Sequence, residues 1–153
     1  MNDINELKSR VNSKTLHVWM LTLATAGIYI IMWLQKNNAI IKDVTKKNVI
    51  SDSFIIWYAA LLGYGMVLTG YKDTVAIALL ATTSTLGASV LLIIWAFKAR
   101  SALQQYALEN FKLDLKMNAF YTFLFNILYV NYCINALEED KKKQDILFSR
   151  IQP

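Results

Sequence analysis

The side chains best suited to chemistry in the apolar parts of this chain are one histidine, one cysteine and a set of hydroxyl and amide groups. His17 stands at the start of an apolar run, and Cys133 lies inside another. A metal site needs several converging ligands and a proton relay needs ionisable groups at depth, and neither pattern accompanies His17. The sequence also lacks Walker, dinucleotide-binding, zinc-protease and nucleophile-elbow motifs. We therefore expect no enzyme activity, no metal and no cofactor.

The hydroxyl and amide groups gather in two of the apolar runs. They are Thr82, Thr83, Ser84, Thr85 and Ser89 in one, and Asn126, Asn131 and Asn135 in the other. Such hydroxyls usually bond back to the backbone of their own helix, and ion-coupled transport has little support without a charged group at depth. Asn131 and Asn135 are one helical turn apart. They are predicted to form hydrogen bonds between helices, worth ~0.6 kcal/mol each on average.

Four stretches without a charged residue carry these groups, namely residues 16–34, 54–71, 74–97 and 117–137. A helix that crosses a bilayer needs ~20 apolar residues, and each stretch approaches or exceeds that length. With 56% hydrophobic residues, the chain is too apolar for an ordinary soluble domain. The sequence predicts an all-α polytopic membrane protein in which residues 1–153 form a single integral membrane domain.

Residues 54–71 and 74–97 are separated by Lys72 and Asp73 alone, so they are predicted to form a tight transmembrane helical hairpin at the centre of the fold. Small residues let two helices approach each other closely in lipid. The candidates for helix packing or partner binding are Ala59, Gly63, Ala81, Thr85 and Ser89 in the hairpin, with Asn126, Asn131 and Asn135 in the last run.

Two amphipathic helices are predicted at the membrane interface, over about residues 35–50 and 98–116. A solvated linker helix is an equal alternative for the first. The net charge is +5, and its basic residues flank apolar runs, which favours anionic lipid over nucleic acid as the partner. The predicted headgroup contacts are Lys42, Lys46, Lys47, Lys98 and Arg100. The charged tail, residues 138–153, is expected to be mobile at its end.

The distribution of Lys and Arg leaves the topology of the two outer runs open. If all four runs span the membrane, the basic residues divide equally between the two sides, and the positive-inside rule gives no orientation. If residues 16–34 and 117–137 enter and return instead, every basic residue except Lys72 falls on one side. Each outer run has a candidate breaking point, at residues 25–27 and at Asn126. In both alternatives the termini share one side, which we expect to be cytoplasmic.

A short motif occupies the first run. Thr25, Gly27 and Tyr29, followed by Trp33, form a Thr-x-Gly-Ile-Tyr signature that ends in Trp. This motif resembles the signature of a family of small bacterial inner-membrane proteins of unknown function. Residues 125–135, rich in aromatic residues and Asn, are similar to the closing segment of some members. The resemblance covers only the first and last runs, and Ala26 stands where a bulkier residue is common. It implies a place in a bacterial inner membrane. It implies nothing about an activity, because the family has no agreed one.

Three functions are compatible with these patterns. The leading hypothesis is a non-enzymatic immunity or exclusion factor that binds a membrane protein or its own copies, and so blocks a toxin, a phage or a conjugative partner. A second is membrane shaping or lipid organisation, since two shallow elements beside a hairpin would expand one leaflet. A third is a small oligomeric channel or transporter subunit built around residues 74–97.

Overall fold

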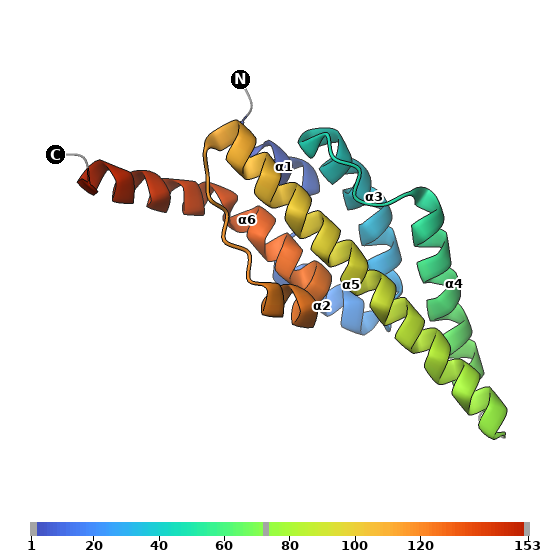
Figure 1. Ribbon diagram of the computed structural model, residues 1–153. Coiled ribbons are helices and arrows are strands. Elements are labelled where there is room, and N and C mark those ends of the chain that lie inside the picture. The colour runs from blue at the N-terminus through green and yellow to red at the C-terminus, as the bar shows by residue number, and fades with distance from the viewer. Residues whose placement is uncertain (1–2, 72–73, 152–153) are drawn as a thin grey trace.

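The computed structural model describes residues 3–71 and 74–151, and these residues fold into six helices. The helices are α1 (Glu6–Val11), α2 (Thr15–Ala24), α3 (Ile28–Thr45), α4 (Asp52–Thr69), α5 (Val75–Phe111) and α6 (Ala119–Ile151) (Figure 1). Three helices in the described chain, α4, α5 and α6, are long and apolar enough to cross a membrane. The prediction of an all-α polytopic membrane protein is confirmed.

The first predicted membrane segment, residues 16–34, is two helices instead of one. Between α2 and α3 the backbone turns through Ala26 (φ 49°) and Gly27 (φ 91°), a left-handed conformation that glycine adopts freely. The chain then reverses direction. The contact that shows this is the hydrogen bond from Trp33 Nε1 on α3 to Ser13 Oγ, just before α2, at 3.2 Å. α2 covers about 15 Å, half of a ~30 Å hydrocarbon core. A continuous span over residues 16–34 is therefore wrong, and the chain path agrees with the re-entrant alternative.

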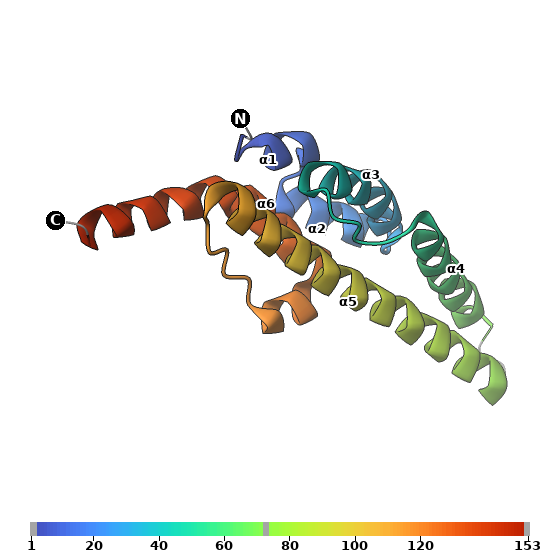
Figure 2. The same ribbon diagram turned by 45° about the horizontal axis from the view of Figure 1, so that its top comes forward.

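The predicted central hairpin is formed by α4 and α5, which lie side by side (Figures 1 and 2). Its predicted turn, Lys72 and Asp73, lies outside the described residues. The closest approach is at Gly65, where an added Cβ would lie 2.6 Å from Thr85 Oγ1 and 3.5 Å from the Ala81 carbonyl oxygen. At Gly63, a Cβ would meet nothing within 4 Å. The packing glycine of the hairpin is Gly65, and Gly63 as a contact between these two helices was a wrong prediction.

The helix predicted over residues 98–116 is the end of α5, and it stops at Phe111. Lys112 adopts a left-handed conformation (φ 54°), and residues 112–118 follow as an extended segment. Leu113, Leu115 and Met117 alternate with exposed residues in this segment, and all three are buried. Every second side chain can face the core in this way only if the chain is extended, so the predicted helix over residues 112–116 is wrong.

The helix predicted over residues 35–50 is the second half of α3, which ends at Thr45. Lys46 turns the chain with φ 56°. The following segment folds back onto α3, where Asn38 Nδ2 donates to the Ile50 carbonyl oxygen at 3.3 Å. Val49 and Ile50 are buried by this return. Residues 46–50 are thus a packed connection to α4, and their predicted helical conformation is wrong.

The last predicted membrane segment, residues 117–137, also contains a reversal. Asn126 breaks α6 with φ 43° and ψ −115°, as its place in the aromatic run predicted. The extended segment 112–118 enters beside the outgoing half of α6, since the Asn118 N–H donates to Tyr129 Oη at 2.9 Å. After the break α6 continues to Ile151. The charged tail is therefore helical as far as Ile151, and its last residues, 152–153, lie outside the described chain.

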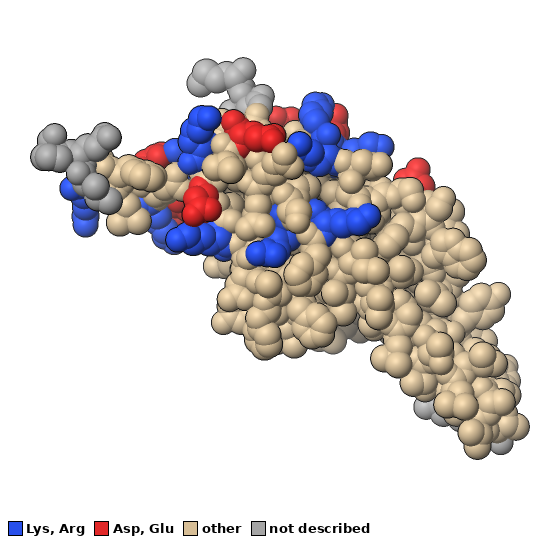
Figure 3. All heavy atoms as spheres, viewed as in Figure 1, with Lys and Arg blue, Asp and Glu red and all other residues tan. Residues whose placement is uncertain are grey.

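The molecule is broad at one end and narrow at the other. α1, α2, α3 and α6 surround the C-terminal part of α5, whereas α4 and α5 alone continue to the narrow end (Figures 1 and 2). On the face shown in Figure 3, the charged side chains of the described residues form a band at the broad end, and no described charged residue lies at the surface of the hairpin beyond it except near the start of α4. The apolar part thus contains a long hairpin beside two shallow reversals.

Candidate functional site

The signature residues of the first run build its reversal. Thr25 Oγ1 donates to the Leu21 carbonyl oxygen at 2.8 Å and accepts the Tyr29 N–H at 2.9 Å. This hydroxyl therefore joins the last turn of α2 to the first turn of α3, where backbone groups lack helical partners. Gly27 supplies the left-handed step between them. The Thr-x-Gly-Ile-Tyr pattern thus has a structural explanation as a helix–turn–helix inside the apolar zone.

Trp33, the last residue of the signature, belongs to a polar cluster that we call the Ser13–Asn131 cluster, formed by Ser13, Thr15, Trp33, Asn131 and Asn135. Ser13 Oγ accepts from Trp33 Nε1 and donates to Asn131 Oδ1 at 2.8 Å. Asn131 Nδ2 donates to the Ser13 carbonyl oxygen at 3.0 Å and to Thr15 Oγ1 at 3.1 Å. Asn135 Nδ2 donates to the same Ser13 carbonyl at 3.0 Å. The cluster fastens the first reversal to α6.

The predicted hydrogen bond between helices is present for Asn131, whose Nδ2 donates to Thr15 Oγ1 at the start of α2. Asn135 bonds instead to the Ser13 carbonyl in the connection between α1 and α2 and to the Asn131 carbonyl of its own helix. Asn131 is fully buried, so its amide groups need these partners. Asn126 stands apart from them. It is half-buried at the helix break, and its Oδ1 has no partner within the described chain. The three asparagines do not form one polar path.

The second reversal is held by Asn118, which sequence reasoning missed. Its Oδ1 accepts the N–H groups of Phe120 at 2.8 Å and Tyr121 at 3.4 Å, which is an N-cap of α6. Arg100 donates through Nε to the Met117 carbonyl oxygen at 2.9 Å, and so ties the entering segment to α5. An Asn directly before an apolar run is a known helix-start signal. That signal was present in the sequence at residues 118–120.

The hydroxyls of α5 bond within their own helix, as predicted. Thr82, Thr83, Thr85 and Ser89 donate to the carbonyl oxygens of Ala78, Leu79, Ala81 and Thr85. Among the predicted packing residues, Ala81 is buried and contacts the Gly65 region, Ala59 is half-buried, and Ser89 is exposed. The hydroxyl donors of Thr82, Thr83, Thr85 and Ser89 are therefore already satisfied. The channel hypothesis for α5 stays a prediction.

The predicted headgroup contacts differ in how free their charges are. Lys42 and Lys98 are exposed, and neither takes part in an ion pair of the described chain. Lys46 pairs with Asp43 at 3.2 Å, and Lys47 pairs with Glu109 at 3.7 Å. Arg100 is half-buried and already bonded to the Met117 carbonyl. Lys42 and Lys98 thus have the freest charges of the five for an external anion.

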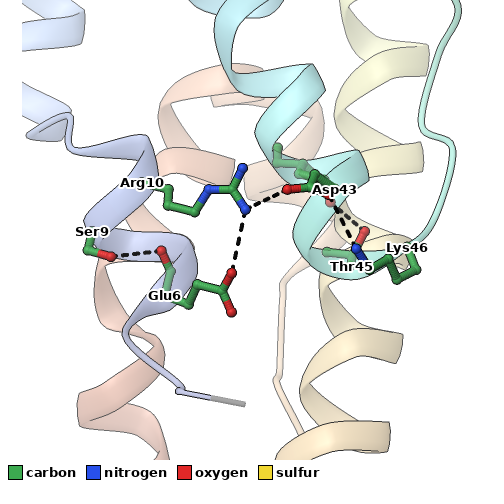
Figure 4. Close-up of polar contacts among 7 residues, drawn as sticks. Glu6, Ser9, Arg10, Asp43, Thr45 and Lys46 are labelled. Atoms are coloured by element: carbon green, nitrogen blue, oxygen red, sulfur yellow. Dashed lines mark hydrogen bonds and ion pairs between the residues drawn. The ribbon is translucent and has the colours of Figure 1, made fainter. Parts of the chain in front are cut away.

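A charged cluster docks α1 onto α3 at the broad end (Figure 4). Arg10 pairs with Asp43 at 2.6 Å and with Glu6 at 3.5 Å. The hydrogen bond from Arg10, followed by that from Lys46, holds the pKa of Asp43 below its ordinary value. The reciprocal bond to Asp43 raises the pKa of Arg10. Both side chains stay charged at neutral pH and hold α1 against the C-terminal turns of α3.

An apolar groove of about 430 Å³ lies between α2 and α6. Trp19 on α2 faces Phe125 and Tyr132 on α6 across it. Thr15 of the Ser13–Asn131 cluster also lines it, so the groove begins directly beside that cluster. Its walls come from both chain reversals, which places an aromatic concave surface within the apolar zone.

No protein family model, curated protein or solved structure matches this chain. The resemblance of the first and last runs to a bacterial family therefore stays a prediction. Within the described residues, no group of three or more His, Cys, Asp or Glu side chains lies together in a way that would hold a metal ion.

Proposed function

We propose that the protein acts without catalysis, as a wedge-shaped membrane protein that organises or bends the bilayer in which it lies. The observation that carries the proposal is the unequal cross-section of its apolar part (Figure 1). α4 covers about 27 Å and is long enough to span, whereas α2 covers about 15 Å. The two reversals therefore add protein to one leaflet only. Area added to one leaflet expands it relative to the other.

The charge distribution supports the same orientation for both reversals. Apart from Lys72, all basic residues lie in segments that precede, connect or follow the apolar parts at the broad end. Under the positive-inside rule this end faces the cytoplasm. We therefore propose a bacterial inner-membrane protein with both termini in the cytoplasm, and with anionic headgroups against Lys42 and Lys98.

Vesicle shape measured by cryo-electron microscopy tests this proposal. Protein inserted in one orientation into preformed vesicles should reduce their mean diameter as the protein-to-lipid ratio rises. The matched control is the same protein at the same ratio in random orientation, because opposite wedges cancel. Protease access to α1, which lies at the broad end, reports the orientation in each sample. Equal diameters in the two preparations at high loading would refute the wedge.

A second candidate, an immunity or exclusion factor that binds another membrane protein, is favoured by the aromatic groove between α2 and α6. Trp19 is 48% exposed and Tyr132 is 58% exposed, and aromatic side chains around a concave surface are common anchors for a partner. A photo-crosslinking residue at Trp19 or Tyr132 should then capture a protein in cells. The control is the same residue at Ile56, an exposed position on α4. Adducts with lipid alone at all three positions would remove this candidate.

A further inference from the structure

A second groove, of about 590 Å³, lies at the broad end between the extended segment that follows α5 and the charged half of α6. Gln144 builds it from the α6 side. Its Oε1 accepts the Asp114 N–H at 2.9 Å and its Nε2 donates to the Lys112 carbonyl oxygen at 2.7 Å. The amide of Gln144 thus pairs with an extended backbone as a neighbouring strand would. This pairing fixes the distance between the two walls.

Two lysine and two aspartate side chains that line the groove form no ion pair within the described chain. Lys112, Asp114 and Lys116 alternate with buried residues along the extended segment, so their side chains share its exposed face. Asp140 on α6 lines the same groove. None of these four side chains takes part in an ion pair of the described chain, whereas Lys143 beside them pairs with Glu139 at 2.8 Å.

The groove also has apolar side chains in its lining. Leu147 and Phe148 line it and are 60% and 59% exposed. Its lower end is at Lys116, one residue before Met117, whose carbonyl is bonded to Arg100. Arg100 follows the apolar part of α5 by three residues. The groove therefore presents charged side chains from both walls beside two exposed apolar side chains of α6, a combination that suits a molecule with a charged head and an apolar tail.

We propose that this groove binds the headgroup of a zwitterionic aminophospholipid, of the phosphatidylethanolamine type. The phosphate would lie against Lys112 and Lys116, and the primary ammonium would donate to Asp114 and Asp140. Leu147 and Phe148 would cover the start of the acyl chains. The charge complement selects this occupant, because an anionic lipid would satisfy the lysines and leave both carboxylates without a partner. The inference deepens the proposed function by naming the lipid that the wedge would hold.

Binding of short-chain phospholipids to the purified full-length protein in detergent, measured by calorimetric titration, tests the site. Phosphatidylethanolamine should bind more tightly than phosphatidylcholine, whose quaternary ammonium has no N–H to donate, and more tightly than phosphatidylglycerol, which has no ammonium. A D114N/D140N variant should lose about tenfold or more in affinity for phosphatidylethanolamine and keep its affinity for phosphatidylglycerol. A K112A/K116A variant should lose affinity for all three lipids.

The matched control is K14A/K36A, which removes two exposed lysines outside the groove and should bind phosphatidylethanolamine as the parent protein does. Circular dichroism checks that each variant is folded, and the single substitution D114N, at an exposed position, serves if the double variant is not. Equal affinity for the three lipids, or unchanged affinity in both groove variants, would overturn the proposal. Vesicle bending without phosphatidylethanolamine would still support the wedge, so the two proposals can fail separately.

Discussion

Asn131 shows how few polar groups hold this membrane fold together. It is fully buried, and its amide bonds both the hydroxyl and the carbonyl group of Ser13, which is 118 positions away in the chain. A buried amide without partners costs more than an average hydrogen bond contributes, because desolvation is not repaid. Single polar side chains therefore decide whether the first reversal stays docked on α6.

The substitution Asn131→Ala should lower the free energy of unfolding by about 1–2 kcal/mol, since it removes the acceptor of the Ser13 hydroxyl and the donor to Thr15 Oγ1. Titration with a denaturing detergent in mixed micelles measures this change. Asn48→Ala is the control, because Asn48 is exposed in the connection between α3 and α4. Equal stability of the two variants would show that the Ser13–Asn131 cluster contributes nothing.

Asp43 should make the docking of α1 depend on pH. Its pKa is lowered in the fold, chiefly by the hydrogen bond from Arg10, so its contribution to stability is complete above the ordinary Asp pKa of about 3.9. The contribution is lost as the pH falls through the lower pKa of the folded state. The protection factors of the α1 amides, which correct for the pH dependence of intrinsic exchange, should therefore fall at acid pH.

The variant Asp43→Asn should abolish this loss of α1 docking at acid pH, the acid step, and show weaker docking of α1 at neutral pH. Asp52→Asn, at the exposed start of α4, is the control and should keep the step. An acid step of the same size in Asp43→Asn would mean that another group controls α1.

At the scale of elements, the hairpin shows why two neighbouring glycines in one helix have different roles. Gly63 and Gly65 are two residues apart on α4, and only Gly65 faces α5. A Cβ at Gly65 would also lie 3.3 Å from the Thr85 backbone nitrogen, so rotation of the Thr85 side chain alone would not make room. The close approach of α4 and α5 at this point depends on the missing side chain of Gly65.

Gly65→Ala should therefore be less stable than Gly63→Ala by about 1–3 kcal/mol, the usual cost of inserting a group into a packed contact. Both substitutions gain the same helix propensity, so the difference isolates packing. Unfolding of the two variants in the same mixed micelles gives the value. A Gly65→Ala variant as stable as its control would indicate that α4 and α5 separate easily here.

At the scale of the whole molecule, the two reversals predict that both termini and the segments that flank the hairpin lie on one side of the membrane, with only the tip of the hairpin on the other. In a Cys133→Ala background, single cysteines at Asn5, Asn48 and Leu108 should react with an impermeant thiol reagent from one side, and a cysteine at Tyr71 from the other. All four positions are outside the buried core. Inverted vesicles provide the reciprocal control.

Protection of Asn48 under conditions that label Asn5 would show that residues 16–34 cross the membrane. Protection of Leu108, with labelling of both Asn5 and Asn48, would show an odd number of crossings between Asn48 and Leu108. The reversal at residues 25–27 and the hairpin of α4 and α5 predict neither result.

The sequence by itself determined which parts of this protein are apolar, where the chain can break and which hydroxyls bond to their own helix. These properties are local: a stretch without charge requires a nonaqueous environment, and Gly27 permits a left-handed step wherever it stands. The N-cap at Asn118 was local too, and could have been recognised from the aromatic run that follows it.

The tertiary structure alone decided what those breaks do. Only the packing of distant elements shows that Gly65 and not Gly63 is the contact, that residues 112–116 are extended, and that Ser13 meets Asn131. Each depends on residues far apart in the sequence, and a single apolar stretch has the same composition whether it crosses a bilayer or turns back halfway. The direction of the chain after each break is set by its distant partners, so it could not be predicted from the stretch itself.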